Sequence, residues 1–414
     1  MADQLAQRLE GFDKPTVWHE FTPLAAEYEA VNLGQGFPDW RAEDFVKQAA
    51  KTALDADFNQ YARPQGHRKL VEVLARKYSK EFGREIRWQD EVAVGVGATE
   101  TIYAALSAFI QSGDEAVVLE PAFDIYQAQV QMAGGSCRFV PLHVRASPET
   151  GEQEFYLDEA TLAAAFSDKT RVVLLNNPHN PTGKVFTKAE LELVAKYVKR
   201  YPRVVVVSDE VYEHIVFDGR KHERIALVDG MWERTLTVSS AGKTFSVTGW
   251  KVGWAIGPSN LVKGIYLANN WIQFSVATPF QEAVANMLEL AEKPYQGFPT
   301  FFAFVADQYT KKRDRLQAAL EAVGVRSVTP RGGIFLYSDI SGVKVPDEFL
   351  KPEQSYDWSF CRWLTIRKGV TAIPTSAFFC AANKAEGSRW ARFAYCKTDE
   401  AIAEAIKRLA SLHE

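Results

Sequence analysis

Two lysines lie in a stretch of the chain that is otherwise rich in small and aromatic residues. Residues 237–254 read TVSSAGKTFSVTGWKVGW and include Lys243 and Lys251. A β-rich segment, 234–238, comes just before, so Lys243 is expected near the end of a buried strand. A lysine amine that is removed from water loses its proton more easily and can then attack carbonyl carbons. The stretch indicates carbonyl chemistry, although a strand-end lysine held in an ion pair is the simpler alternative.

The elements that would position these lysines are short apolar runs that end in polar residues. These runs are 116–119 (AVVL), 171–175 (RVVLL), 204–207 (VVVV) and 235–238 (TLTV). Uniformly apolar runs of about four to six residues are typical of strands buried on both faces, as in parallel sheets. Helical patterns at 99–110 and 188–201 lie between them. Strands that alternate with helices predict an α/β fold with a mostly parallel central sheet.

Chemically useful side chains follow several of these predicted strands. They are Phe123, Asp124, Asn180, Asp209, Tyr212, Ser240 and Lys243. Ligands of open α/β sheets bind beyond the carboxyl ends of the strands. We therefore expect one site at that edge of the sheet.

The C-terminal part of the chain has a different pattern. Strands are expected at 332–337 and 389–395, and helices at 360–368 and 398–412, with Thr398 as the N-cap of the last helix. This mixture predicts a smaller α+β domain. The expected division is a large domain over 46–300 and a small domain formed by 1–45 and 301–414.

Composition excludes several classes of protein. The chain has 414 residues, of which 47% are hydrophobic and 24% are charged, as in ordinary globular proteins with a sizeable core. Its net charge of −4 gives no basic stripe for nucleic acid. The four cysteines form no CxxC pair, so we expect no metal site and a reducing, cytoplasmic location. No apolar run is long enough for a membrane span, and the first residues do not form a signal or transit peptide.

A nucleotide site is the tempting alternative for the lysine stretch. Gly242-Lys243-Thr244 after a strand is similar to the end of a P-loop, and 204–210 (VVVVSDE) is similar to a Walker B strand. A P-loop needs a glycine five residues before Gly242, where Thr237 stands. The order of the two motifs is also inverted, so a nucleoside triphosphatase is not favoured.

The motifs, taken in order, resemble those of a known family. From GQGFPD at 34–39 to RFAY at 392–395, the chain is similar to class I aminotransferases of the pyridoxal-phosphate (PLP) fold type I. Within that class it most resembles the group of kynurenine aminotransferase, glutamine transaminase K and cysteine-S-conjugate β-lyase. The resemblance implies the cofactor pyridoxal 5′-phosphate, which supplies an electron sink for amino-group chemistry. It also implies a ping-pong transfer of an amino group from an amino acid to a 2-oxo acid.

The resemblance assigns roles around the cofactor ring. Lys243 in SAGKTF matches the Schiff-base lysine that also moves the α-proton. Asp209 in SDEVY matches the aspartate that keeps the ring nitrogen protonated, with the neighbouring Glu210 as the alternative. Tyr212 and Asn180 match the pair that hydrogen-bonds the phenolic oxygen, although Asn180 could instead shape the proline-rich turn NPHNPTG.

The resemblance also implies a phosphate anchor. Gly97, Ala98 and Thr99 precede a helix whose first amides suit a dianion. Ser240 and Lys251 match further phosphate ligands, and Phe123 matches the ring that stacks on the pyridine. Tyr61 in NQYARPQG matches a tyrosine that reaches the phosphate of the neighbouring subunit, which implies a homodimer with shared active sites. Packing is the plainer role for a tyrosine in a loop.

The resemblance also implies residues that recognise the substrate, in the same site as the phosphate anchor. Arg392 in RFAY matches the arginine that binds the substrate α-carboxylate with both guanidinium nitrogens, and a surface arginine is the alternative. Gly36 would bring its backbone into contact with the substrate, and Asn180 would also face the substrate. Trp18 would line the pocket for the substrate side chain, and a place in the hydrophobic core is the alternative.

Two positions depart from the animal kynurenine-type enzymes. Those enzymes have a tyrosine where Thr99 stands and a histidine where Ser275 stands, and both segments here resemble bacterial methionine-preferring relatives. Kynurenine, glutamine, methionine and aromatic amino acids are the expected donors. A methionine-preferring aminotransferase and a cysteine-S-conjugate β-lyase are the alternatives. A transcriptional regulator of this fold is not favoured, because too few residues precede GQGFPD for a winged-helix domain.

Overall fold

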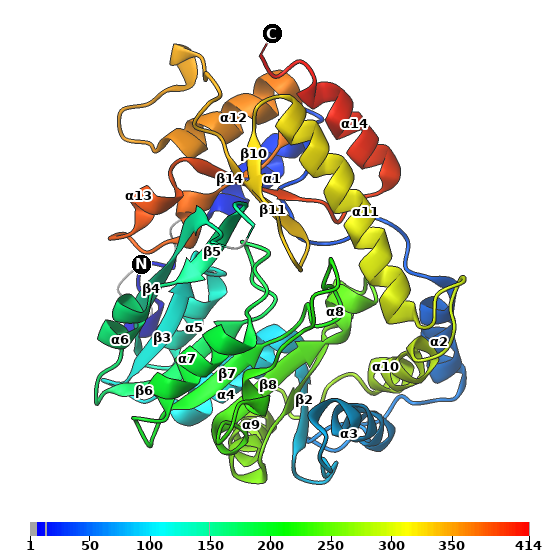
Figure 1. Cartoon of the computed structure of the whole chain (residues 1–414). Helices are drawn as coiled ribbons and strands as arrows, with labels where there is room; N and C mark the ends of the chain where they lie inside the picture. The colour runs from blue at the N-terminus through cyan, green and yellow to red at the C-terminus, as the bar shows by residue number, and fades with distance from the viewer. Residues whose placement is uncertain (1–5, 13–14, 149, 414) are drawn as a thin grey trace.

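A mixed sheet of eight strands forms the core of the molecule. The computed structural model describes residues 6–12, 15–148 and 150–413. Within them, the largest sheet has the strand order β2-β9-β8-β7-β6-β3-β4-β5 (Figure 1). Its strands are β2 (Val92–Val96), β9 (Val252–Ile256), β8 (Thr235–Ser240), β7 (Val205–Asp209), β6 (Thr170–Asn176), β3 (Glu115–Glu120), β4 (Ser136–Ala146) and β5 (Gln153–Leu157).

The centre of this sheet is parallel. Strands β8, β7, β6, β3 and β4 are parallel to one another. Strand β9 runs antiparallel to both of its neighbours, β2 and β8. Strand β5 is antiparallel to β4 at the other edge. Strands β3, β6, β7 and β8 coincide with the four apolar runs read from the sequence. The predicted mostly parallel α/β sheet is therefore confirmed.

Helices cover both faces of the sheet. Alternate residues of a strand point to opposite faces, so Val118 and Val207 pack with α4, α5 and α9, whereas Val117 and Val206 pack with α6 and α7. These helices are α4 (Gly97–Phe109), α5 (Ile125–Met132), α9 (Ser259–Ile272), α6 (Glu159–Ala165) and α7 (Lys188–Val198). Burial on both faces explains why the central strands are almost entirely apolar.

Three further helices lie beside the β2 edge, where α2 and α3 both pack on α10 (Figure 1). They are α2 (Asp44–Asp55), α3 (Arg68–Phe82) and α10 (Thr278–Ala291). The long helix α11 (Phe301–Ala322) follows α10 and leads to the C-terminal unit. At its start Phe301 stacks on Phe245, with ring centroids 5.5 Å apart. The first turn of α11 is thereby attached to the segment that carries Lys243.

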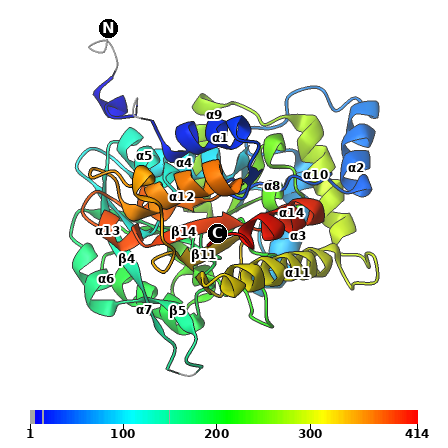
Figure 2. The ribbon, with the colours of Figure 1, turned by 90° about the horizontal axis from the view of Figure 1, so that it is seen from above.

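The C-terminal unit is a four-stranded sheet of order β10-β11-β14-β13, with helices around it (Figure 2). Its paired strands are all antiparallel. The elements are β10 (Arg326–Val328), β11 (Phe335–Asp339), β13 (Ile373–Pro374), β14 (Trp390–Ala394), α12 (Tyr356–Lys368) and α14 (Asp399–Leu409). Thr398 caps α14, as expected, because its hydroxyl accepts a hydrogen bond from the amide of Ala401.

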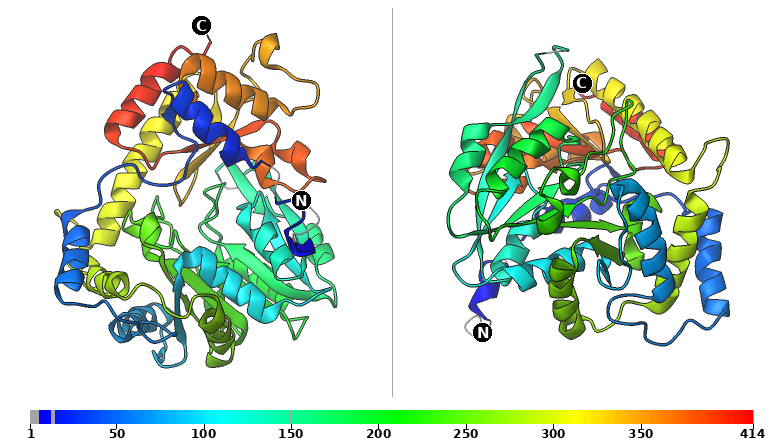
Figure 3. Two further views of the ribbon diagram at one scale, coloured as in Figure 1. Left: turned by 180° about the vertical axis from the view of Figure 1, so that it is seen from behind. Right: turned by 60° about the horizontal axis from the view of Figure 1, so that its bottom comes forward.

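The N-terminal segment contacts both units. Helix α1 (Val17–Glu27) packs on α12, where Glu20 forms an ion pair with Arg362, and β1 (Val31–Asn32) pairs with β12 (Val370–Thr371). Residues 6–12 instead lie beside α5, where the Gln131 side chain donates to the carbonyl of Glu10 (Figure 3). The division into a large domain over 46–300 and a small domain formed by 1–45 and 301–414 stays a prediction. Residues 1–5, 13–14, 149 and 414, which fall within these domains, lie outside the described residues.

In the described part of the chain, no helix is both long and apolar enough to cross a membrane. The same residues include no group of three or more His, Cys, Asp or Glu side chains placed to hold a metal ion. All four cysteines carry free thiols.

Candidate active site

A cavity of about 440 Å³ opens at the carboxyl ends of the parallel strands. Most of the residues singled out in the sequence line it: Trp18, Gly36, Gly97, Ala98, Thr99, Phe123, Asn180, Asp209, Tyr212, Ser240, Lys243, Lys251 and Arg392. They come from segments more than 370 residues apart in sequence. Among the predicted residues, Tyr61 and Asp124 do not line the cavity, although Asp124 contacts Trp18, which does.

Lys243 lies in the short helix α8 (Ala241–Thr244), directly after β8. Its Nζ donates to the carbonyl oxygen of Gly36 at 2.5 Å, and it forms no ion pair with any described residue. Burial lowers the pKa of Lys243 to about 8, with the charge of Arg392 acting in the same direction. The ion-pair alternative is therefore wrong, and the amine is prepared for nucleophilic chemistry.

Asp209 ends β7 and faces the cavity, whereas Glu210 does not line it. The hydroxyl of Tyr126 donates to Asp209 Oδ2 at 2.7 Å, and the amide of Val211 donates to Oδ1 at 3.2 Å. Burial raises the pKa of Asp209 to about 6, while the hydrogen bond from Tyr126 works against this rise. A buried carboxylate at this position can hold a protonated ring nitrogen.

Tyr212 and Asn180 face the cavity from neighbouring strand ends. Burial raises the pKa of Tyr212, so its hydroxyl stays protonated and can donate a hydrogen bond. The backbone amide of Asn180 donates to Asn176 Oδ1 at 2.7 Å. The side-chain Oδ1 of Asn180 accepts from Arg392 Nη1 at 3.2 Å. Asn180 therefore contributes its side chain to the site as well as shaping the turn.

The opposite end of the cavity suits a phosphate group. Gly97 begins α4 with a φ of +74°, and a Cβ built there would lie 3.0 Å from Lys251 Nζ. Lys251 itself adopts a left-handed backbone with a φ of 54°, which is unusual for a residue with a side chain. The ammonium group, the first amides of α4 and Ser240 thus converge where a dianion would be stabilised.

Arg392 lies in β14 and is only 1% exposed, so the surface alternative is wrong. Its Nη2 donates to the carbonyl oxygen of Gly34 at 2.6 Å. The guanidinium carbon lies 4.0 Å from the ring centroid of Phe335, 4.9 Å from that of Phe378 and 5.2 Å from that of Trp18. Arg392 has no carboxylate partner among the described residues, and its Nε has no acceptor. This buried, uncompensated cation requires an anion.

Aromatic residues close the substrate end of the cavity. The indole nitrogen of Trp18 donates to Asp124 Oδ2 at 3.0 Å, which fixes the ring beside Arg392. Phe123 lines the cavity and meets Tyr126 edge-on. Glycine is required at position 36, because a Cβ there would lie 2.3 Å from the ring of Phe335.

Tyr61 lies outside the cavity of its own chain. It is 82% exposed and contacts Phe274 edge-on, with ring centroids 5.2 Å apart. Ser275, one of the two divergent positions, lies in the same region, because its hydroxyl donates to the carbonyl oxygen of Ala62 at 3.1 Å.

Some lining residues were not predicted as site residues from the sequence. They are Gln35, Phe37, Ile102, Ile125, Tyr126, Asn176, Val211, Gly242, Thr248, Val252 and Phe335. Tyr126 is the most consequential, because it holds Asp209. Its position three residues after Phe123, beyond the strand expected at 116–119, could have indicated it.

The donor set fits pyridoxal phosphate. The cavity supplies an amine without an ionic partner, a buried carboxylate for the ring nitrogen, hydroxyl and amide groups for the phenolic oxygen, and a cation with helix amides for the phosphate. Together with the parallel sheet, these features define a PLP-dependent enzyme of fold type I.

Comparison with known proteins defines the family. Residues 28–409 match the family "Aminotransferase class I and II", and the chain belongs to it. It is a PLP-dependent aminotransferase, which acts on an amino acid and a 2-oxo acid.

The relatives include enzymes of two specificities. A kynurenine–oxoglutarate transaminase of Dictyostelium discoideum is 44% identical over 96% of this chain and 94% of its own length. Human kynurenine–oxoglutarate transaminase 1 is 39% identical over 98% of this chain and 97% of its own length. The solved structure of YbdL from Escherichia coli, with a methionine aminotransferase function, has a TM-score of 0.88 at 32% identity and covers 99% of each chain.

Proposed function

We propose that this aminotransferase takes the amino group of kynurenine and passes it to a 2-oxo acid, with glutamine, methionine and aromatic amino acids as further donors. The observation that carries the proposal is Arg392, a buried cation without an anionic partner among the described residues, in the same cavity as the amine of Lys243. An α-amino acid matches this pair, because its carboxylate would bind Arg392 while its α-carbon faces Lys243. The kynurenine–oxoglutarate transaminases among the relatives support the donor.

The chain's own residues then divide the work. Bound pyridoxal phosphate supplies the electron sink for the bonds at the substrate's α-carbon. Lys243 would hold the cofactor through its amine and would move the α-proton as base and then as acid. Asp209 would keep the ring nitrogen protonated, and Tyr212 with Asn180 would stabilise the phenolic oxygen. The phosphate would be held by Gly97, Ala98, Thr99, Ser240 and Lys251, and Phe123 would pack on the ring.

Recognition of the donor side chain falls to the aromatic end of the cavity. Trp18 and Phe37 offer apolar faces to an aromatic or thioether side chain, and Gly36 lets the backbone approach. Apolar pockets discriminate weakly between side chains of similar size. We therefore expect a ranked set of donors instead of a single one.

A donor panel tests this proposal. The PLP-loaded protein is mixed with kynurenine, glutamine, methionine or phenylalanine, and conversion of the cofactor absorption band is followed in single turnovers. Kynurenine should convert the band at a rate within about tenfold of the best donor. Methionine turnover more than about a hundredfold faster than kynurenine would support the methionine-preferring alternative instead. Release of pyruvate and thiol from a cysteine S-conjugate without any 2-oxo acid would support the β-lyase.

We further propose that two copies of the chain complete each other's sites in a homodimer. An exposed apolar patch surrounds Tyr61 and continues along one side of α9. It consists of Tyr61, Leu267, Trp271, Ile272 and Phe274, whose exposed fractions are 82%, 51%, 85%, 45% and 49%. A second copy of the chain is the occupant that the Tyr61 motif implies, because Tyr61 would then reach the partner's phosphate site.

A cytoplasmic location likewise stays a prediction.

Replacing Trp271 at the centre of the apolar patch should weaken the dimer. Trp271→Glu removes a large apolar side chain and adds a charge, so the dimer dissociation constant should rise at least about tenfold. Sedimentation velocity over a dilution series measures this constant. Leu350→Glu is the control, because Leu350 is also exposed but lies in the C-terminal unit. An unchanged dimer in Trp271→Glu, or equal loss in both variants, would contradict the proposed interface.

A further inference from the structure

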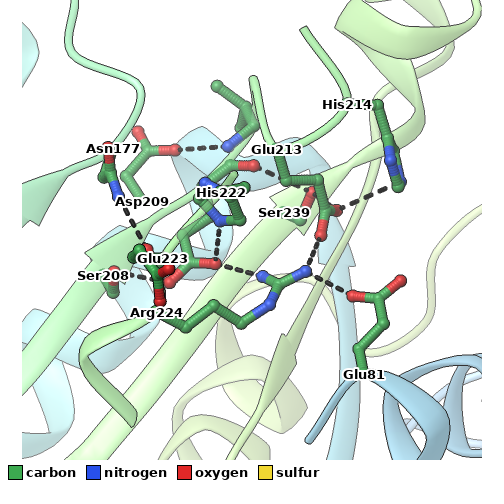
Figure 4. A network of polar contacts seen from close by, with 12 residues as sticks. Glu81, Asn177, Ser208, Asp209, Glu213, His214, His222, Glu223, Arg224 and Ser239 are labelled. Atoms are coloured by element: carbon green, nitrogen blue, oxygen red, sulfur yellow. Dashed lines mark hydrogen bonds and ion pairs between the residues drawn. The ribbon is translucent and has the colours of Figure 1, made fainter. Parts of the chain in front are cut away.

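A buried cluster of charged residues lies next to Asp209, the residue proposed to bind the cofactor ring nitrogen (Figure 4). At its centre Arg224 forms ion pairs with Glu81, Glu210 and Glu213. Arg224 is 6% exposed, Glu213 is 5% exposed and Glu210 is fully buried. We call these four residues the Arg224 cluster. Replacing Arg224 would leave the buried carboxylates of Glu210 and Glu213 without the cation that they share, which is strongly destabilising.

The cluster alternates with the site residues along one short segment. Asp209 and Tyr212 face the cavity, whereas their neighbours Glu210 and Glu213 point to Arg224. Ser208 and His222 complete the set around Glu210, with a hydrogen bond of 2.8 Å from the Ser208 hydroxyl and a contact of 2.7 Å to His222 Nε2. The segment 209–213 is thus held from behind at two points, and these points fix where Asp209 and Tyr212 lie.

The cluster also reaches the neighbouring strands. The hydroxyl of Ser239, next to Ser240 in β8, donates to Glu213 Oε1 at 2.6 Å. The hydroxyl of Tyr78 donates to the same oxygen at 2.8 Å and accepts from the indole nitrogen of Trp254 in β9 at 2.8 Å. Glu213 therefore connects the ends of β7 and β8 with β9.

The charges of the cluster bear on Asp209. Arg224 pairs with the carboxylates of Glu81, Glu210 and Glu213. A second cation, Lys77, also pairs with Glu81. Burial opposes ionisation of Glu213, but Arg224 with His214 and Lys77 lowers its pKa below the ordinary value. The negative charge of Glu210 contributes to the raised pKa of Asp209. Without Arg224, two buried carboxylates beside Asp209 would lose their main counter-charge.

We propose that Arg224 is a positioning residue of this enzyme, which holds the 209–213 segment in register with the cofactor ring and balances the carboxylates behind Asp209. The inference rests on the proposed role of Asp209 at the ring nitrogen. Arg224 touches neither the cavity nor the reacting atoms, and it acts through Glu210 and Glu213.

Three variants test this role. Arg224→Met keeps the length of the side chain without its charge. Arg224→Lys keeps the charge without the fork that reaches three carboxylates. The triple variant Arg224→Met/Glu210→Gln/Glu213→Gln removes the cation together with the two adjacent charges. For each, the affinity of the cofactor-free protein for pyridoxal phosphate, kcat and KM for the donor, and the melting temperature are measured.

Arg224→Met should raise the dissociation constant for pyridoxal phosphate at least about tenfold and lower kcat by a similar factor, with KM nearly unchanged. The triple variant should recover only part of the lost affinity, because its charges balance again while the ion pairs that hold the 209–213 segment stay absent. Arg313→Met is the matched control, since Arg313 is also buried and pairs with Asp218 and Asp314 away from the cavity. It should lower the melting temperature and leave the affinity for pyridoxal phosphate within about twofold of the wild type.

Wild-type affinity in folded Arg224→Met would overturn the inference, as would a triple variant no better than the single one. If Arg224→Met does not fold, Arg224→Lys decides: a loss of affinity of at least about tenfold supports the role of the guanidinium fork in holding the segment, and wild-type affinity overturns that role. Asp209→Asn is measured in parallel. Wild-type affinity in Asp209→Asn would show that the proposed role of Asp209 is wrong. A loss there without a loss in Arg224→Met would refute only the inference about Arg224.

Discussion

Replacing Lys243 with alanine should abolish amino-group transfer almost completely. Lys243 lines the same cavity as Asp209 and Arg392, and in the proposed function it both holds the cofactor and moves the α-proton. Loss of a positioned acid–base group alone lowers rates by about 10²- to 10⁴-fold, so kcat for kynurenine should fall by at least this factor. Borohydride reduction followed by peptide mapping should place the pyridoxyl mass on Lys243 in the wild type and nowhere in Lys243→Ala.

The pH dependence of cofactor loading gives an independent test. Since burial lowers the pKa of Lys243 to about 8 in the cofactor-free protein, the unprotonated amine becomes more abundant as the pH rises through 8. The rate of covalent loading should rise over this range and level off above it. Lys312→Ala is the control, because Lys312 is also buried but pairs with Asp399. A pyridoxyl mass on another lysine, or the same rate loss in Lys312→Ala, would show that the assignment is wrong.

Arg392→Leu should remove recognition of the substrate α-carboxylate. Removing one partner of a buried, hydrogen-bonded charge pair costs about 2–5 kcal/mol, which corresponds to a loss of kcat/KM of about 30- to 5000-fold. The fold should tolerate the change, because leucine fits among Trp18, Phe335 and Phe378, and no carboxylate of the described protein loses a partner. Steady-state kinetics with kynurenine measures the loss, and thermal unfolding confirms that the variant is folded.

A substrate without the carboxylate separates recognition from general damage. The decarboxylated amine with the kynurenine side chain cannot use Arg392, so the wild type and Arg392→Leu should convert it at rates within about threefold of each other. If the variant loses as much activity toward this amine as toward kynurenine, Arg392 supports the site structurally and does not bind the carboxylate.

The sequence predicted those parts of the fold in which local pattern and environment agree. Strands β3, β6, β7 and β8 were recognisable because both of their faces are buried, which makes them uniformly apolar. Strand β4 was missed, because its burial is irregular and its middle carries a proline. The strand expected at 332–337 begins only at Phe335, since the amides of Gly332 and Gly333 bond to the carbonyls of Gly183 and Ile215.

The site residues were predictable where they follow a strand end in a motif, as Asp209 and Lys243 do. The residues that surround these site residues were not predictable, because they come from segments that are distant in the sequence. The rings around Arg392 belong to residues 18, 335 and 378, and Glu81 lies 143 residues from its partner Arg224. Whether Asp209 or Glu210 faces the cavity was open in the sequence, and the ion pair between Glu210 and Arg224 decides it.

The electrostatic inventory of the cavity bears on the choice of acceptor. Its lining includes three cations, Lys243, Lys251 and Arg392, and a single acid, Asp209. In the proposed function every one of these cations is already engaged, since the first joins the cofactor, the second neutralises the phosphate and the third binds the α-carboxylate. No cation of the described lining is left for a second carboxylate at the far end of a 2-oxo acid. An acceptor with a neutral side chain could therefore bind without further counter-charge, whereas the second carboxylate of a dicarboxylic acceptor such as oxoglutarate would need a cation from outside this lining, and the partner copy is the source that the proposed homodimer offers.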